Sequence, residues 1–114
     1  MLFLLQPLML NLSDGTKAVQ FARQVISNYV CPTKKSLPTL GSVFQEKHGV
    51  FVTLHAYPDH ELRGCIGIPL PVMSLQDAIV ESAQSVTNDP RFPPLQAREL
   101  DAIIVEMTVL TKPE

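Results

Sequence analysis

The segment LRGCIG, residues 62–67, brings a guanidinium and a thiol together on a short apolar run. Arg63 stands two residues before Cys65, with Gly64 between them and Gly67 two positions later. A cysteine attacks electrophiles as its thiolate, and a nearby guanidinium favours that form. The same arginine could instead bind an anionic ligand. Both chemistries compete with a plainer interpretation, because a strand cysteine is usually a small core residue and an arginine near a hairpin end is usually solvated.

A predicted hairpin positions this segment. The runs GVFVTLHA (49–56) and ELRGCIGI (61–68) have strand-like patterns, and YPDH between them carries a Pro-Asp turn signal. Side chains alternate across a strand, so a loop of about three or five residues would bring the aliphatic sets of both strands, Leu62 included, to one face. The other face would then carry Phe51, Thr53, His55, Glu61, Arg63 and Cys65.

This register gives the two glycines different roles. Gly64 would lie on the aliphatic face, where the missing side chain lets a helix approach the sheet. Gly67 would lie on the face of Cys65 and leave open space beside the thiol. We therefore expect both glycines to contribute to a ligand site.

Three histidines are candidates for a base or a metal ligand. His55 would share a face with Cys65 and is the first candidate for the base, with His48 and His60 weaker. We expect no metal site, because His60 falls in or beside the turn and need not converge with His55 and Cys65. The residues identify no cofactor.

The remaining pattern predicts one α+β domain over residues 1–114, with a mostly antiparallel sheet flanked by helices. Helix caps, prolines and apolar periodicity set the expected bounds. The other predicted elements are a helix capped by Ser13 and Asp14 that ends near Val30, a helical turn at 43–47, a helix that Ser74 caps and that stops before Pro90, and a strand over 102–110.

Composition restricts the possible partners. The net charge of −2 offers no basic surface for a nucleic-acid duplex. The opening MLFLLQPLMLNL is apolar but shorter than the roughly 20 residues that span a bilayer, so we expect it to pack onto the core and predict no membrane association. Two cysteines are too few for a disulfide framework, which favours a cytoplasmic protein.

Three motifs in order identify a family resemblance. ELRGCIG, then DPRFPPL after the second helix, then VEMTVLTKPE resemble the AMMECR domain family, whose prokaryotic members are called AmmeMemoRadiSam system protein A. The resemblance runs from about Ser13 to the last residue. It implies an α+β fold with two subdomains and a cleft beside the signature motif. Family members are usually much longer, so we expect this chain to be their N-terminal portion.

The second signature, residues 89–94, could add to the same cleft. The resemblance suggests that Arg91 presents its guanidinium there, where Arg91 and Arg63 together would suit a carboxylate or phosphate. A plainer interpretation is that Asp89 caps a turn and Phe92 anchors the connection in the core. Glu106 could pair with one of these arginines across the sheet, or point into water.

Two functions stay open. In the first, the protein is a thiol-dependent component of a modification pathway linked to Memo-like and radical-SAM proteins, with Cys65 as nucleophile and His55 as base. In the second, it is a non-catalytic binding or adaptor domain in which Arg63 holds an anionic small molecule or a partner peptide. The expected ligand-binding residues are Arg63, Gly64, Gly67 and Arg91. Neither function fixes an oligomeric state.

Overall fold

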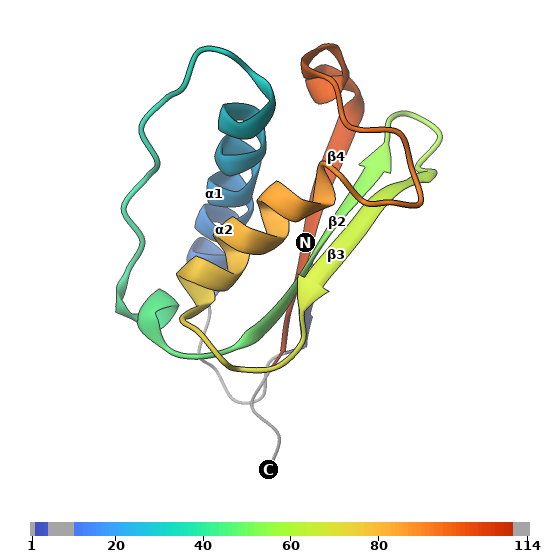
Figure 1. Ribbon diagram of the computed structural model, residues 1–114. Helices are drawn as coiled ribbons and strands as arrows, with labels where there is room; N and C mark the ends of the chain where they lie inside the picture. Colours follow the sequence, from blue (N-terminus) through green and yellow to red (C-terminus); the bar gives the residue numbers. More distant parts are fainter. Residues whose placement is uncertain (1, 5–10, 111–114) are drawn as a thin grey trace.

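In the part of the chain that the structure describes, a four-stranded sheet carries two α-helices on one face (Figure 1). The computed structural model describes residues 2–4 and 11–110 of the 114-residue chain. In chain order the elements are β1 (Leu2–Leu4), α1 (Leu12–Val30), the 3₁₀ helix η1 (Ser42–Gln45), β2 (Gly49–Ala56), β3 (Leu62–Ile68), α2 (Leu75–Val86), the 3₁₀ helix η2 (Ala97–Ala102) and β4 (Ile103–Leu110). The predicted α+β class is confirmed.

The strand order is β1-β4-β2-β3. Both β4 and β3 run antiparallel to β2, so the mostly antiparallel sheet is confirmed. β1 pairs in parallel with β4 and was not predicted, because three residues of an apolar segment carry no strand pattern. Of the rest of the opening segment, residues 1 and 5–10 lie outside the described residues, whereas Asn11 caps α1 and Leu12 begins it, 79% exposed. Among the described strands, β3 is therefore an edge strand, and the signature motif lies on it.

Both predicted helices are present. α2 begins after Ser74, whose hydroxyl accepts a hydrogen bond from the backbone N–H of Asp77 at 3.1 Å. α1 ends at Val30 as predicted but starts earlier than expected, because Asn11 and Asp14 form a reciprocal capping box. The buried positions of α2 are those expected from its periodicity: Leu75, Ala78, Ile79, Ser82, Ala83 and Val86.

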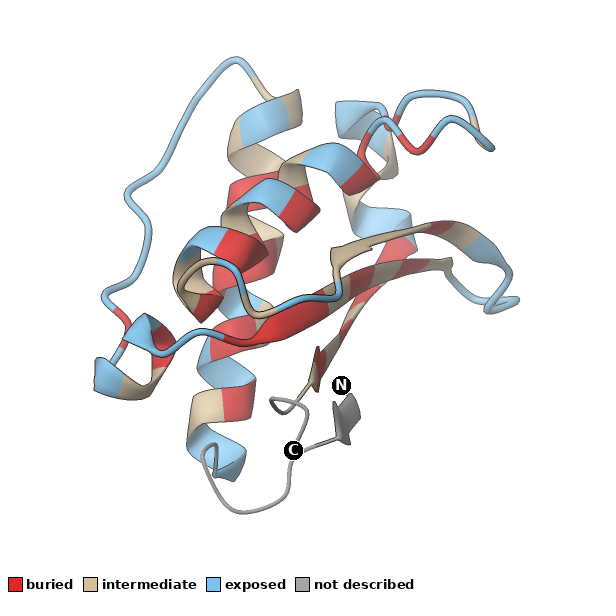
Figure 2. Cartoon of the chain, turned by 60° about the horizontal axis from the view of Figure 1, so that its bottom comes forward, coloured by how far each residue is buried: buried red, intermediate tan, exposed pale blue. Residues whose placement is uncertain are grey.

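The core lies between these helices and the inward face of the sheet (Figure 2). Along β4 every second residue is buried, starting at Ile103, which is the alternation that a sheet covered on one face requires. One apolar residue near the end of α1 stays outside this core. Tyr29 is 50% exposed, because the long connection that follows the helix does not cover it.

The hairpin has the predicted register, with one irregularity. Five residues, 57–61, join the strands, and Val52 pairs with Ile66 as the aliphatic pattern requires. The register then shifts, because Leu54 pairs with Gly64 whereas His55 pairs with Leu62. Arg63 is thus the extra residue of a β-bulge. The prediction that Leu62 joins the aliphatic face is wrong, since the bulge moves it to the face of His55.

Candidate functional site

Asp89 joins the two signature motifs. Its carboxylate is 2% exposed and accepts hydrogen bonds from the backbone N–H of Cys65 at 3.0 Å and from the guanidinium of Arg91 at 2.7 Å. Arg91 in turn donates to the carbonyl oxygen of Cys65 at 3.1 Å. The segment after α2 therefore fastens onto the outer edge of β3, beside which it passes in Figure 1.

These contacts determine the charge state of the pair. The Arg91 guanidinium, hydrogen-bonded to Asp89, holds the pKa of that carboxyl well below its usual range despite the burial. Backbone N–H groups of Cys65 and Arg91 act in the same direction. The Asp89 carboxylate also raises the pKa of Arg91. The pair is therefore ionised at any physiological pH.

Arg63 is held by a different carboxylate. Its Nε and Nη2 donate to the two oxygens of Glu99 at 3.0 and 3.1 Å, a bidentate ion pair. Burial opposes the charged form of Glu99, but the hydrogen bonds and charge of Arg63, with the backbone N–H of Gln96, outweigh it and lower the Glu99 pKa. The guanidinium of Arg63, which was expected to act on Cys65, is thus paired with the carboxylate of Glu99 on η2.

Cys65 lies on the sheet face opposite the helices. Its thiol is half-buried, and its sulfur lies 3.3 Å from the hydroxyl oxygen of Thr53 on β2. Among the described residues no hydrogen bond joins His55 to this thiol. His48 is bonded to the carbonyl of Leu110 at the other end of β2. The role of His55 as a base for Cys65 stays a prediction, because its ring contacts Glu106 and not the thiol.

Glu106 binds histidines, and the expectation that it pairs with an arginine is wrong. It lies on β4 opposite Thr53, diagonal to His55, and its Oε1 contacts His55 Nδ1. His60 folds back from the hairpin loop, and its Nε2 lies 3.5 Å from the same oxygen. The two imidazole rings stack with centroids 4.1 Å apart.

The glycines have one expected role and one unexpected role. A Cβ on Gly64 would lie 3.1 Å from both Cγ2 and the carbonyl oxygen of Val86, which confirms that this glycine lets α2 approach the sheet. The prediction that Gly67 leaves open space is wrong. A Cβ there would lie 2.7 Å from Cα of Phe51 and within contact distance of the Val50 carbonyl, so Gly67 permits close approach of β2.

A cavity of about 280 Å³ lies beside the motif strand, between the edge of β3 and α2. Three consecutive residues of β3, numbers 66–68, form one wall. The wall from α2 is polar, and one of its hydroxyls, that of Ser82, is buried without a hydrogen-bond partner among the described residues. The α2 wall consists of Glu81, Ser82, Gln84 and Ser85. A second cavity, of about 390 Å³, lies between α1 and the connection that follows it and contains no signature residue.

The turn at 89–94 has the predicted cap but not the predicted anchor. Asp89 accepts a hydrogen bond from the backbone N–H of Arg91, which confirms the turn cap. Phe92 is only half-buried and lies under the Arg91 guanidinium, 5.4 Å from its carbon to the ring centroid. Leu95 is the residue that enters the core.

Sequence reasoning missed Glu99 and the contact between Asp89 and Cys65. The signal for Glu99 was weak: it follows Gln96 by three residues, which is a capping-box spacing at the start of η2. Nothing local connects Asp89 to a strand 24 positions earlier. Within the described part of the chain, no helix is both long and apolar enough to cross a membrane.

Comparison with known proteins places the chain in a family. The AMMECR1 family model matches residues 19–114. Protein MJ0810 of Methanocaldococcus jannaschii is 53% identical over 107 residues, covering 93% of this chain and 53% of that protein. Protein Ta0236 of Thermoplasma acidophilum is 43% identical over 105 residues, covering 91% and 51%. This chain thus spans about half the length of these relatives.

A solved structure shows the same fold. The crystal structure of the uncharacterized protein PH0010 from Pyrococcus horikoshii superposes with a TM-score of 0.83 at 38% identity, covering 94% of this chain and 56% of that one. The family match includes both signature segments, α1 from Val19 onward and every described element after it. The chain belongs to the AMMECR1 family.

Proposed function

We propose that this chain is a binding domain that takes a short, extended peptide segment along the edge of β3. The observation that carries the proposal is a backbone edge in the signature motif that faces a cavity with an unpartnered hydroxyl. Strand addition of this kind takes its affinity from main-chain hydrogen bonds and its selectivity from neighbouring pockets.

The outward-facing groups of β3 define where a ligand could pair. The N–H and carbonyl of Cys65 point away from β2. This follows from their hydrogen bonds to Asp89 and Arg91, which lie outside the edge of the sheet. Outward and inward groups alternate along an antiparallel strand, so the N–H and carbonyl of Gly67 also point outward. The groups of Cys65 are occupied and those of Gly67 face the cavity, which limits pairing to residues 66–68.

The opposite wall supplies the groups that a peptide would meet. The hydroxyl of Ser82 is buried and unpartnered among the described residues, so a ligand that hydrogen bonds to it would relieve a desolvation penalty. Ser85 and Gln84 add neutral donors and acceptors, and Glu81 adds one negative charge. This chemistry suits amide groups and an amine.

The electrostatics favour a neutral or cationic segment over an anionic one. Arg63 is engaged by Glu99 and Arg91 by Asp89, so each guanidinium already has a carboxylate partner. An anion would have to displace these carboxylates. In this proposal the two arginines position the strand edge, and they do not bind the ligand themselves.

Titration of the ¹⁵N-labelled chain with a pool of capped tripeptides tests the proposal. The amide resonances of 66–68 should shift most, and Ser82→Ala should weaken binding about tenfold through loss of one buried hydrogen bond. Ser36→Ala, the same change at an exposed position, is the control. Equal affinity in the two variants, or no shift at 66–68, would contradict the proposal.

Thiol chemistry at Cys65 is the second candidate function, favoured by the Thr53 hydroxyl 3.3 Å from the sulfur. It would make the protein a thiol-dependent component of the pathway with Memo-like and radical-SAM proteins that the family resemblance implies. Cys31 is also half-buried and serves as an internal control. If Cys65 is a reactive thiol, an alkylating agent should modify it faster than Cys31 at neutral pH. Slower modification of Cys65 would count against thiol chemistry.

A further inference from the structure

We propose that His55, His60 and Glu106 form a binding site for a divalent transition-metal ion, with Zn²⁺ as the reference ion. Their three donor atoms all lie within 4.8 Å of one another. The site is independent of peptide binding, because these side chains lie at the hairpin end of the sheet face opposite the helices and none of them lines the cavity between β3 and α2.

The sheet register creates the first half of the site. His55 pairs with Ile104 and Thr53 pairs with Glu106, so His55 and Glu106 are diagonal neighbours on one face. Their side chains are 20% and 29% exposed, which leaves them partly desolvated. Partial burial favours binding of an ion to a fixed set of ligands, because fewer side-chain rotamers are lost on coordination.

The hairpin loop supplies the third donor. His60 has a φ of 62°, a conformation uncommon for a residue other than glycine, and its ring stacks on that of His55 with an interplanar angle of 12°. Its side chain is 58% exposed, so the imidazole can adjust its position. Both imidazoles already direct a nitrogen at the same carboxylate oxygen of Glu106.

The donor set and spacing match a zinc site with an open position. Bonds of about 2.0–2.2 Å in tetrahedral geometry place neighbouring ligand atoms about 3.3–3.5 Å apart. His60 Nε2 and Glu106 Oε1 are 3.5 Å apart, and all three donor atoms lie within 4.8 Å of one another. The stacked imidazoles must turn out of their parallel arrangement on binding, because an ion lies in the plane of each ring that ligates it. Two histidines and one glutamate form a known three-ligand zinc set, in which water takes the fourth position.

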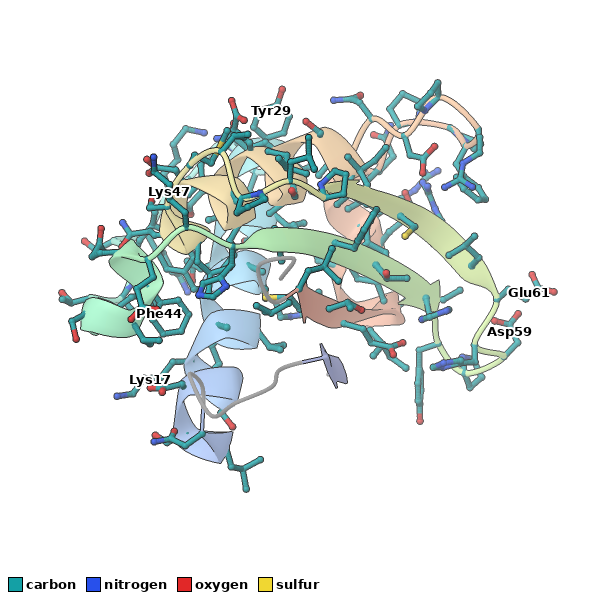
Figure 3. The ribbon with its side chains drawn as sticks, turned by 90° about the horizontal axis from the view of Figure 1, so that it is seen from below. Lys17, Tyr29, Phe44, Lys47, Asp59 and Glu61 are labelled. Atoms are coloured by element: carbon teal, nitrogen blue, oxygen red, sulfur yellow. The ribbon has the colours of Figure 1, made fainter. Side chains whose placement is uncertain are left out.

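Charge around the loop also favours a cation. Asp59 and Glu61 flank His60 in sequence, and Figure 3 labels both at the tip of the β2–β3 hairpin. Imidazole nitrogens select Zn²⁺ and its transition-metal neighbours over Mg²⁺ and Ca²⁺, which prefer oxygen ligands. The site should therefore discriminate strongly against Mg²⁺.

Calorimetric titration of the untagged 114-residue chain with Zn²⁺ tests the site. We expect one ion per chain and no competition from equal Mg²⁺. His60→Ala and Glu106→Gln should each weaken binding at least about tenfold, since each removes one of three ligands. Glu81→Gln makes the same charge change at an exposed glutamate on α2, away from the hairpin, and should leave the affinity within about twofold.

A spectroscopic measurement separates this site from adventitious thiol binding. Co²⁺ in place of Zn²⁺ should give tetrahedral d–d bands without sulfur-to-cobalt charge transfer, and Cys65→Ser should leave both metals bound. Affinity unchanged in Glu106→Gln, or lost in Cys65→Ser, would overturn the proposal. Circular dichroism of each variant without metal separates lost ligation from lost folding.

Discussion

At the scale of single residues, the Asp89 carboxylate connects the two signature motifs through four hydrogen bonds. It is a buried carboxylate with hydrogen bonds from two backbone N–H groups and one guanidinium. Because these bonds connect a turn to an edge strand, the residue acts as a positioning group for the motif. Its side chain is not available to a ligand.

Replacing Asp89 should therefore destabilise the fold. Asp89→Asn loses the charge that three donors require, and we expect a loss of about 2–3 kcal/mol in the free energy of unfolding. Urea denaturation measures it. Asp101→Asn, at an exposed aspartate nearby in the chain, should change the stability by less than about 0.5 kcal/mol.

The same residue gives the stability a pH dependence of known sign. The folded-state pKa of Asp89 is lowered, so its contribution is complete above the ordinary carboxyl pKa of about 4 and is lost as the pH falls below it. The wild-type chain should lose more stability than Asp89→Asn between about pH 5 and pH 2. Parallel pH profiles would contradict this assignment.

Gly67 provides a second test at residue scale. Gly67→Ala would place a methyl group against the backbone of β2, and backbone cannot move aside, so we expect a loss of about 2–3 kcal/mol. At Gly41 a Cβ would have no atom of the other described residues within 4 Å, so Gly41→Ala should be neutral or slightly stabilising. Thermal unfolding of both variants makes the comparison. Equal effects would mean that β2 and β3 are further apart than described.

At the scale of elements, the Arg63–Glu99 pair connects the bulge of β3 to η2. The Arg63 side chain is 15% exposed, and two of its nitrogens, Nε and Nη2, donate to the Glu99 carboxylate. A double-mutant cycle with Arg63→Ala and Glu99→Gln should give a coupling energy of about 1 kcal/mol, above that of ordinary surface pairs. Additive effects would show that the pair contributes nothing.

Elements set by local rules were predictable, and those set by distant contacts were not. Ser74 caps α2 and Pro32 ends α1 through neighbours in sequence. Alternation alone fixed the register of β2 and β3 as far as Leu54. Arg63, the bulged residue, pairs with Glu99 36 positions away, and β1 pairs with β4. No window of the sequence contains both partners of such a contact.

The candidate site shows the same division. The sequence pattern placed Cys65, Thr53 and His55 on one face, and the structure keeps them there. It did not show that each signature arginine meets a carboxylate, since Asp89 and Glu99 reach the motif only after the chain has folded back. For this reason the sequence led us to expect that Arg63 and Arg91 would both be available to bind an anionic ligand.

At the scale of the whole molecule, the proposed peptide site and the proposed metal site lie on different parts of the sheet. The cavity between β3 and α2 lies at one edge on the helix-covered side, and the histidine–glutamate cluster lies on the uncovered face. The uncovered face also carries Cys65. One fold thus presents separate surfaces that share a rigid sheet, and each can be altered by substitution without touching the other.

The pairing of β1 with β4 has a consequence for biosynthesis. Leu2 lies opposite Thr108, so the first described strand to leave the ribosome has no sheet partner until the last strand is made. The α1 helix and the β2–β3 hairpin can form from neighbouring residues long before that. Because contacts of such large sequence separation form late and slowly, β1 can join the sheet only after synthesis has passed β4.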